Sequence, residues 1–213
     1  HWSKPTQQNE LAGRDVLIVG AGVNGIVLGA KLGQLGIPYT IVEKNNNVGG
    51  TWLENSYPGC GVDTPNHAYS LSFGRRYRWS RYFSLRDEIQ DYLERCTHEF
   101  GVQSHIQFQT TLTSSRWIEC DQCWESELEG PDGKGQLRSG FLVSAIGQFN
   151  QPRNPTIPGS GSFKGEAFHT AHWPPGIDLT NQRVSIIGTG ASAMQIVPSI
   201  ADQVESLTIY QRT

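Results

Sequence analysis

The chain has 213 residues, of which 37% are hydrophobic and 17% are charged, and its formal net charge is −3. This length allows one large or two modest domains, and the composition is typical of a globular protein. A net charge near zero provides no basic field that would attract nucleic acid. No run approaches the roughly 18 apolar residues that a membrane-spanning helix needs. We therefore expect neither a nucleic-acid partner nor a membrane partner.

The N-terminal segment and the cysteines indicate a reducing compartment. Residues 1–10 are polar and lack the apolar core of a secretory signal peptide. A disulfide framework is not expected at this length and composition, so we predict a cytoplasmic location. Cys120 and Cys123 have the spacing of a redox or zinc pair, but no second Cys or His pair completes the four ligands of a zinc site. We predict no metal. Because residue 1 is not Met, we expect a part of a longer protein.

Residues 15–43 have the pattern of a strand, a glycine turn, a helix and a second strand. Residues 15–19 form a short apolar run that leads into Gly20, as a buried parallel strand does. Apolar residues then recur at helical spacing over 24–35, and Gly36 is a natural helix end. A second strand is predicted over 39–43. The segment is therefore predicted to be a βαβ opening.

The middle of the chain is predicted to contain a long loop, a helix and several strands. Residues 44–83 are rich in Gly, Pro, Asn and aromatic residues, and a loop of this length in a compact domain is usually functional. Ser84 and Asp87 have the spacing of a capping box that begins a helix. The strands and the turn that follow are predicted over 106–113, 115–118, 124–128, 131–135 (the turn) and 137–146.

The last third of the chain repeats the pattern of the first. Residues 147–161 are dense in Pro, Gly and Asn and are predicted to link two domains. Strands follow over 183–187 and 206–211, with a helix predicted over 191–201 that Pro198 kinks or ends early. We therefore predict an α/β fold with two Rossmann-like dinucleotide-binding units, the second incomplete. The predicted domains are residues 1–149 and residues 150–213.

The first glycine turn, Gly20-Ala-Gly22-Val-Asn-Gly25, has the spacing and the context of a dinucleotide-binding fingerprint. In such a turn Gly20 permits the tight bend, Gly22 lets a pyrophosphate approach the backbone, and Gly25 lets the helix pack on the strand. The helix N-terminus adds amide donors and the positive end of a dipole. The alternative is an ordinary strand–helix turn, but Glu43 at the end of the next strand favours nucleotide binding.

The second turn, Gly188-Thr-Gly190-Ala-Ser-Ala193, has Ala at the third glycine position, which the looser fingerprint tolerates. Glu43 and Arg212 occupy equivalent places, at the ends of the strands that follow the two turns. A carboxylate accepts hydrogen bonds from ribose hydroxyls and repels a 2′-phosphate, whereas a guanidinium binds a phosphate. Unless Arg212 is only a surface residue, the second site takes NADP. FAD fits the first site better than NAD, because a hydride donor needs an acceptor in the same protein.

Two longer motifs accompany these turns. Residues 50–63 fit the pattern G-x-W-x4-Y-P-G-x3-D, and residues 163–174 fit F-x-G-x3-H-x3-W-P. Both resemble signatures of the Baeyer–Villiger monooxygenases, and the second resembles the fingerprint of that family. The glycine turns flank the fingerprint in the family's order, and the resemblance covers residues 15–213. Residues 59–67 (GCGVDTPNH) most resemble the branch that acts on aryl ketones such as 4-hydroxyacetophenone.

The resemblance implies an enzyme that uses FAD and NADPH to insert one oxygen atom of O2 next to a ketone carbonyl. NADPH reduces FAD, O2 forms a peroxyflavin, and the ketone becomes an ester or lactone. Asp63 is expected near the flavin ring, where it orients a catalytic Arg, and His169 and Trp173 are expected in the linker that couples the domains. The aromatic, Gly-rich loop around Asp63 separately predicts that its carboxylate is partly desolvated, unless Asp63 is only a turn residue before Thr64 and Pro65. The residues expected to bind FAD or NADP are Gly20, Gly22, Gly25, Glu43, Lys44, Gly50, Thr51, Trp52, Asp63, Tyr69, Leu112, Gly147, Gly188, Thr189, Gly190, Ser192, Gln195, Arg212 and Thr213.

Several assignments stay open. Residue 61 is Gly where many family members have Arg, which changes the charge expected around Asp63. His169 is more often a packed, structural histidine than a chemical one, and Trp173 is equally suited to be a packing anchor. The catalytic Arg is expected beyond residue 213, so the 213-residue chain alone is expected to be inactive. The alternative functions are an N- or S-oxygenating flavin monooxygenase, or nucleotide binding without turnover.

Overall fold

The computed structural model describes residues 15–212. These residues form two units, one made of residues 15–53 and 90–150, the other of residues 54–89 and 151–212. The chain therefore passes from one unit to the other at three points. Residues 54–89 lie in the same unit as the C-terminal part of the chain, whereas the functional domains 1–149 and 150–213 stay a prediction.

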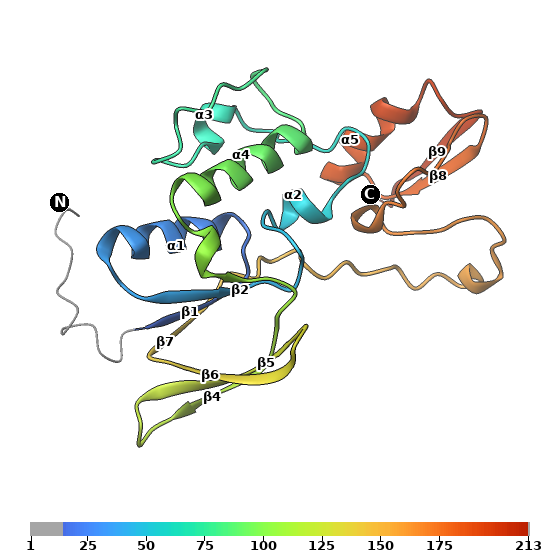
Figure 1. The fold of residues 1–213 in the computed structure, drawn as a ribbon. Helices are drawn as coiled ribbons and strands as arrows, with labels where there is room; N and C mark the ends of the chain where they lie inside the picture. The colour runs from blue at the N-terminus through green and yellow to red at the C-terminus, as the bar shows by residue number, and fades with distance from the viewer. Residues whose placement is uncertain (1–14, 213) are drawn as a thin grey trace. The chain divides into compact units, whose positions relative to one another are not determined.

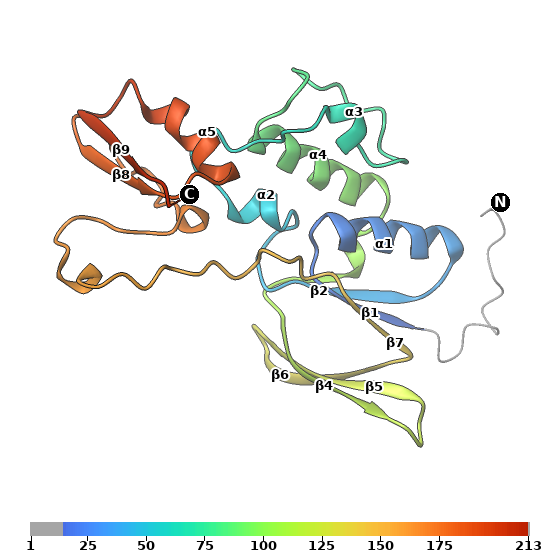
Figure 2. The same ribbon diagram turned by 180° about the vertical axis from the view of Figure 1, so that it is seen from behind.

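The first unit is built on a parallel sheet, which confirms the predicted α/β, Rossmann-like opening. The apolar β1 strand pairs with β2 on one side and β7 on the other, so its side chains Leu17 and Ile18 are fully buried. Figures 1 and 2 show α1 on one face of this sheet and the antiparallel strands on the other. In order across the sheet, the strands are β3 (Ile106–Gln107), β2 (Tyr39–Val42), β1 (Val16–Val19) and β7 (Phe141–Ser144).

Helix α1 (Val23–Leu35) has the predicted extent and ends at Gly36, whose φ of 68° is left-handed. This conformation lets the Gly36 N–H bond to the carbonyls of Leu32 and Gly33, which closes the helix. Helix α4 (Arg86–Glu99) follows the predicted Ser84 start. The capping-box prediction was wrong, because the Ser84 hydroxyl bonds to Glu88 and the Ser84 N–H donates to Asn66 Oδ1 at 3.0 Å.

The second sheet of this unit is an antiparallel meander of β4 (Thr111–Ile118), β5 (Cys123–Gly130) and β6 (Gly133–Ser139). Two predicted strands were wrong here. The strand expected over 106–113 is divided near Gln109, whose φ of 52° is left-handed. The strand expected over 137–146 is divided at Gly140, because β6 pairs with β5 whereas β7 pairs with β1 in the other sheet.

A small apolar core joins the two sheets of the first unit. Leu17 of β1, Val42 of β2 and Leu128 of β5 are buried together, with Leu112 and Leu142 partly buried against them. Alternating side chains of the meander supply these contacts, while their neighbours face solvent. The core therefore fixes the sheet from which the first glycine turn projects.

The second unit contains short helices and a two-stranded parallel sheet. Within the predicted irregular segment 54–83 the structure forms α3 (Asn66–Tyr69), and α2 (Thr51–Glu54) lies across the point where the chain changes unit. Pro198 lies inside α5 (Ala191–Ile200), so of the two predicted alternatives the early end was wrong, and the kink stays a prediction. The remaining elements are η2 (Gln103–His105) in the first unit and η3 (Ser160–Ser162), η4 (Thr170–His172), β8 (Arg183–Ile187) and β9 (Ser206–Tyr210) in the second.

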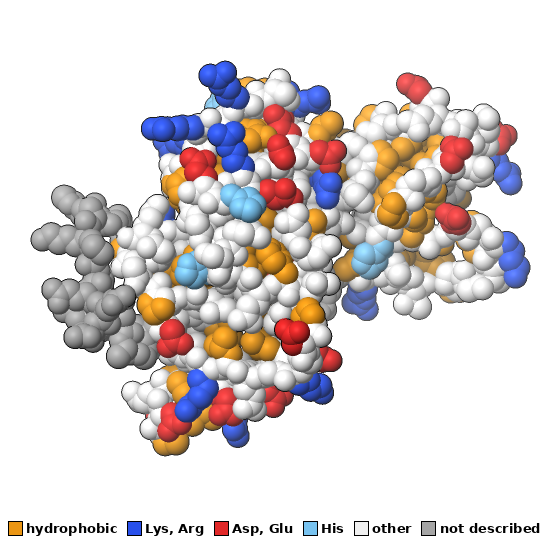
Figure 3. All heavy atoms as spheres, in the orientation of Figure 1, with side chains coloured by type: hydrophobic (Ala, Val, Ile, Leu, Met, Phe, Trp, Pro, Cys, Tyr) orange, Lys and Arg blue, Asp and Glu red, His pale blue; other side chains and the backbone are white. Residues whose placement is uncertain are grey.

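Two surface features of the second unit stand out in Figure 3. Apolar side chains of β8 and β9, including Ile187 and Tyr210, stay exposed, because a sheet of two strands has little cover of its own. Basic side chains gather over the segment that joins α3 to α4, where four arginines are exposed, namely Arg75, Arg76, Arg78 and Arg81.

Candidate nucleotide-binding site

The two glycine turns have nearly the same backbone geometry. The φ angle is +106° at Gly20 and +104° at Gly188, a region that favours glycine. Each of these residues donates its N–H to the last carbonyl of the neighbouring strand, from Gly20 to Val42 at 2.8 Å and from Gly188 to Tyr210 at 2.9 Å. The repeated pattern seen in the sequence is therefore a repeated structure.

The N-terminal ends of α1 and α5 present unpaired backbone donors. Gly22 and Gly190 are the N-caps, with φ and ψ of −73° and −171° in one and −72° and −179° in the other, and neither helix has a side-chain cap bond. A β-carbon at Gly22 would meet only Gly50 Cα, at 3.7 Å, and one at Gly190 would meet nothing within 4 Å. Backbone that is open in this way can lie directly against a phosphate.

Gly25 has a different role from Gly22. A β-carbon at Gly25 would lie 2.0 Å from the Gly20 carbonyl oxygen, so this glycine is required by the packing of α1 on its own turn. The equivalent position in the second turn is the buried Ala193, so that turn accommodates a methyl group. The close approach predicted for Gly25 is therefore confirmed by the geometry.

Glu43 connects the end of β2 to the first turn. Its Oε2 accepts a hydrogen bond from the Ala21 N–H at 2.7 Å, and its Oε1 accepts one from the Asn45 N–H at 2.9 Å. Only 4% of the residue is exposed. An ionised carboxylate has about four acceptor positions, so two remain for a ligand. The predicted bond to a ribose hydroxyl stays a prediction.

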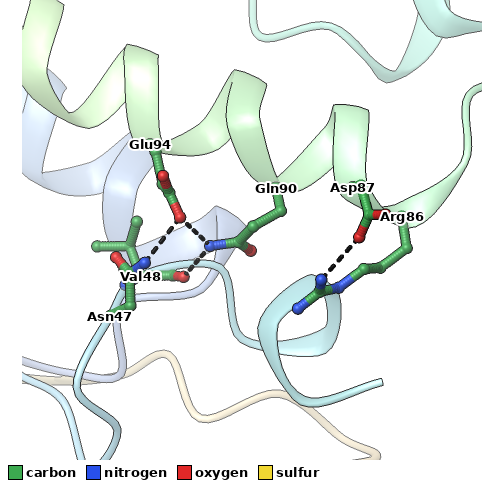
Figure 4. A network of polar contacts seen from close by, with 6 residues as sticks. All are labelled: Asn47, Val48, Arg86, Asp87, Gln90 and Glu94. Atoms are coloured by element: carbon green, nitrogen blue, oxygen red, sulfur yellow. Dashed lines mark hydrogen bonds and ion pairs between the residues drawn. The ribbon is translucent and has the colours of Figure 1, made fainter. Parts of the chain in front are cut away.

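A buried polar network supports the Gly49–Gly50 segment beside the turn (Figure 4). Gln90 Nε2 donates to Val48 O at 2.7 Å and to Glu94 Oε1 at 2.8 Å. A β-carbon at Gly49 would lie 2.0 Å from Gln90 Oε1, and one at Gly50 would lie 3.0 Å from Gly22 Cα. Gln90 therefore holds the two glycines against the first turn. Gln90 was not predicted from the sequence, because its spacing from Val48 matches no local pattern.

The other predicted FAD contacts are dispersed. Trp52 is buried, Lys44 and Thr51 are exposed, and Leu112 packs in the core between the two sheets. Gly147 has a left-handed φ of 75° and is exposed. Asp63 and Tyr69 belong to the other unit. The structure thus brings together the first turn, Glu43 and Gly50.

Around the second turn, Thr189 is exposed and Ser192 is half-buried at the first turn of α5. Arg212 is exposed two residues after the end of β9. Gln195 uses its side chain within the protein, where it bonds to Tyr57 and Gly61. Thr213 lies outside the described residues. The contacts of these residues with NADP stay predictions.

The predicted catalytic and coupling residues have distinct surroundings. Asp63 is exposed, so the expected desolvation of its carboxylate was wrong. His169 Nδ1 accepts a hydrogen bond from the Ala171 N–H at 3.1 Å and so caps η4. Trp173 packs edge-on against Phe168, with ring centroids 5.2 Å apart. The predicted roles of His169 and Trp173 in coupling the domains stay predictions.

Over residues 15–212, three or more His, Cys, Asp or Glu side chains are nowhere grouped to hold a metal ion. Within the same range, every helix is too short or too polar to cross a bilayer. Cys120 and Cys123 are free thiols at the β4–β5 turn.

Comparison with known proteins identifies the family. The model of the NAD(P)-binding Rossmann-like domain matches residues 18–84, and the model of the flavin-binding monooxygenase-like family matches residues 71–213. An uncharacterized monooxygenase, y4iD, of Sinorhizobium fredii is 45% identical over 93% of the chain, and a Baeyer–Villiger monooxygenase of Streptomyces coelicolor is 42% identical over 93%. The chain spans 30% and 38% of the length of these two relatives.

Solved structures agree with this assignment. The crystal structure of OTEMO in complex with FAD and NADP superposes with a TM-score of 0.86 at 36% identity, and the match covers 94% of this chain and 39% of that one. This likeness includes both glycine turns, because it extends over nearly all of the chain. The sequence, the two matching turns and the family model together show that the chain belongs to the flavin-binding monooxygenase-like family.

Proposed function

We propose that the protein is an FAD- and NADPH-dependent Baeyer–Villiger monooxygenase, which converts a ketone to an ester or lactone. The observation that carries this proposal is the pair of matching turns followed by opposite charges, with Glu43 after the first and Arg212 after the second. Relatives named as Baeyer–Villiger monooxygenases and a structural neighbour that holds FAD and NADP support it.

The residues of the first unit fit FAD. The open backbone at Gly22, the buried carboxylate of Glu43 and the Gly49–Gly50 segment would hold its adenosine and pyrophosphate. The second turn, with Ser192 and Arg212, would hold NADPH. When bound, FAD supplies the redox chemistry that activates O2, and NADPH supplies the electrons. On this assignment residues 1–149 are the FAD part, and residues 150–213 are the linker and the start of the NADP part.

Product analysis of the full-length protein tests the proposal. The FAD-loaded protein is incubated with NADPH, O2 and an aryl ketone such as 4-hydroxyacetophenone, which the segment 59–67 favours as substrate class. The expected product is the corresponding aryl ester. If sulfides or amines are oxygenated and no ketone yields an ester, the protein is instead an N- or S-oxygenating flavin monooxygenase.

We also propose a cytoplasmic location. All four cysteines are free thiols, and two of them, Cys60 and Cys96, are buried. Free thiols persist in a reducing compartment. Fractionation of cells that produce the protein at its natural level, followed by immunoblotting, should recover it with cytosolic enzymes; recovery with the membranes would contradict this.

A further inference from the structure

The side chain of Gln90 reaches from α4 to the segment that precedes Gly50, and its amide has a single orientation that suits its neighbours (Figure 4). Gln90 Nε2 donates to Val48 O at 2.7 Å and to Glu94 Oε1 at 2.8 Å. Both partners can only accept, so a reversed amide would place its oxygen against two other oxygens. The orientation of Gln90 is therefore fixed by the groups that accept its hydrogen bonds.

The oxygen of the same amide is left unsatisfied. Within residues 15–212, Gln90 Oε1 is buried and accepts no hydrogen bond. It packs against Gly49, where a β-carbon would lie 2.0 Å from it. An acceptor that is buried without a donor costs free energy, so this oxygen does not stabilise the fold. What Gln90 contributes is its two donated bonds, and the one to Val48 O leads toward the first glycine turn.

The bond from Gln90 fixes the peptide group between Val48 and Gly49. In a trans peptide the C=O and the N–H point in opposite directions. Because the Val48 carbonyl is turned to Gln90, the Gly49 N–H points away from α4, and it donates to Ala21 O at 3.0 Å. The Val48 N–H is held as well, since it donates to Asn47 Oδ1 at 2.8 Å. A single peptide group thus connects α4 to the first glycine turn.

The first turn passes this orientation on to Gly22. Both backbone groups of Ala21 are engaged, because its N–H donates to Glu43 Oε2 at 2.7 Å and its carbonyl accepts the bond from Gly49. The peptide group between Ala21 and Gly22 is also trans, so the Gly22 N–H points away from Gly49. In the part of the chain that the structure describes, this N–H donates to no protein acceptor. It is therefore a donor that the turn keeps available for a phosphate.

We infer that Gln90 is a positioning residue for the FAD pyrophosphate, because it sets the direction of the Gly22 N–H through the peptide group between Val48 and Gly49. The inference rests on the proposed FAD site but not on the oxygenation reaction. Gln90 does not need to touch the cofactor, since Gly49 covers its oxygen and its nitrogen bonds within the protein. Consecutive hydrogen bonds polarise one another, so removal of the first donor weakens the bonds that follow it.

Reconstitution of the full-length apoprotein with FAD tests this inference. Gln90→Met keeps the length of the side chain but donates no hydrogen bond. The Kd for FAD, measured by flavin fluorescence titration, should therefore rise about tenfold to a hundredfold, which corresponds to one hydrogen bond to a charged group. At saturating FAD, the phosphorus NMR resonances of the bound pyrophosphate should shift relative to those in the wild type, because the donor that faces them has moved.

Thr97→Val is the matched control. It removes the bond from Thr97 Oγ1 to Leu93 O at 2.8 Å, which is a buried bond from a side chain to the backbone in the same helix but does not lead to the glycine turn. Its Kd for FAD should stay within about threefold of the wild-type value. Its phosphorus resonances should be those of the wild type, since a loss of helix stability alone does not reorient the Gly22 N–H.

The other outcomes separate the inference from the proposed function. If Gln90→Met binds FAD as the wild type does, or if it shifts no phosphorus resonance, the inference is wrong. An equal loss of FAD affinity in Gln90→Met and Thr97→Val would also overturn it, because Gln90 would then only stabilise the fold. If Gln90→Met does not fold, Gln90→Leu serves in its place with the same expected results. A wild-type protein that does not bind FAD would overturn both proposals, whereas one that binds FAD and makes no ester would overturn only the proposed function.

Discussion

The Glu43 carboxylate bonds to the Ala21 N–H at 2.7 Å, which ties the end of one strand to the turn that follows its neighbour. The carboxylate is buried, and its other oxygen also accepts a backbone bond, from Asn45. Glu43 therefore shapes the turn in addition to its predicted contact with a ribose. Glu43, which was predicted as a ligand-binding residue, thus also has a structural role in the first turn.

We expect Glu43→Gln to destabilise the protein. The Gln side chain has one oxygen in place of the two carboxylate oxygens, each of which accepts a bond from one backbone N–H, so one of these bonds is lost. Loss of a hydrogen bond to a charged group costs roughly 1.5–3 kcal/mol. The free energy of unfolding in urea measures this loss. Glu129→Gln, at an exposed position, should cost less than about 0.5 kcal/mol. Equal stability of the two variants would show that the buried bonds of Glu43 contribute little.

Gly22→Ala and Gly25→Ala should fail for different reasons. At Gly25 the new methyl group would lie 2.0 Å from the Gly20 oxygen, so we expect this variant not to fold stably. At Gly22 the space is open within the protein, so we expect the free energy of unfolding to fall by at most about 1 kcal/mol. The FAD affinity should fall at least tenfold, because a loss of about 1.4 kcal/mol in binding free energy is enough for this. Thermal unfolding and flavin fluorescence titration separate the two effects. Normal FAD binding by Gly22→Ala would show that the FAD pyrophosphate does not bind at this turn.

Arg212→Ala should discriminate between the two nicotinamide nucleotides. A hydrogen-bonded ion pair with a 2′-phosphate is worth roughly 1.5–3 kcal/mol, so the Kd for NADPH should rise about tenfold to a hundredfold while the Kd for NADH stays unchanged. Arg183→Ala is the matched control, because Arg183 is exposed at the start of β8, whereas Arg212 follows the end of β9. An equal loss for both nucleotides would remove the 2′-phosphate assignment.

The lowered pKa of Glu88 predicts that the stability of the folded protein depends on pH. Burial by itself raises the pKa of Glu88, but hydrogen bonds from Ser84 and Ser80 outweigh it and hold the pKa below its usual value. A lowered pKa in the folded protein stabilises it above the unfolded value of about 4.3, and this contribution is lost as the pH falls through the folded value. The difference in unfolding free energy between wild type and Glu88→Gln should therefore shrink as the pH is lowered from about 6 to about 3. If the difference in unfolding free energy between wild type and Glu88→Gln stays constant over this pH range, the folded-state pKa of Glu88 is not lowered.

The two strand–turn–helix openings were predictable because their signals are local. A glycine with φ above 100° recurs after each apolar strand, and Gly36 ends α1 as its residue type indicates. The strands near Gln109 and Gly140 were not predictable, because a change of sheet depends on partners far along the chain. The early end expected at Pro198 failed for a similar reason, since Ile196 and Ile200 are buried and α5 stays helical beyond the proline.

The site was only partly predictable on the same grounds. The fingerprint glycines and Glu43 have fixed spacing, so their roles follow from the sequence. Gln90 and the bond between Tyr57 and Gln195 have no fixed spacing and appear only when the chain is folded. Asp63 was expected to be desolvated because its neighbours are aromatic, but these neighbours do not cover it.

The assignment of residues 54–89 to the same unit as residues 151–212 has a consequence for synthesis of the protein. On the ribosome, the Tyr57–Gly61 loop emerges long before α5, the surface on which it packs. The first unit can complete its sheet once β7 has been made, while this loop still waits for its partner. A recombinant piece that begins at residue 151 would likewise expose the face of α5 marked by Gln195 and Ser199, so the second nucleotide module cannot be excised as a continuous stretch of chain.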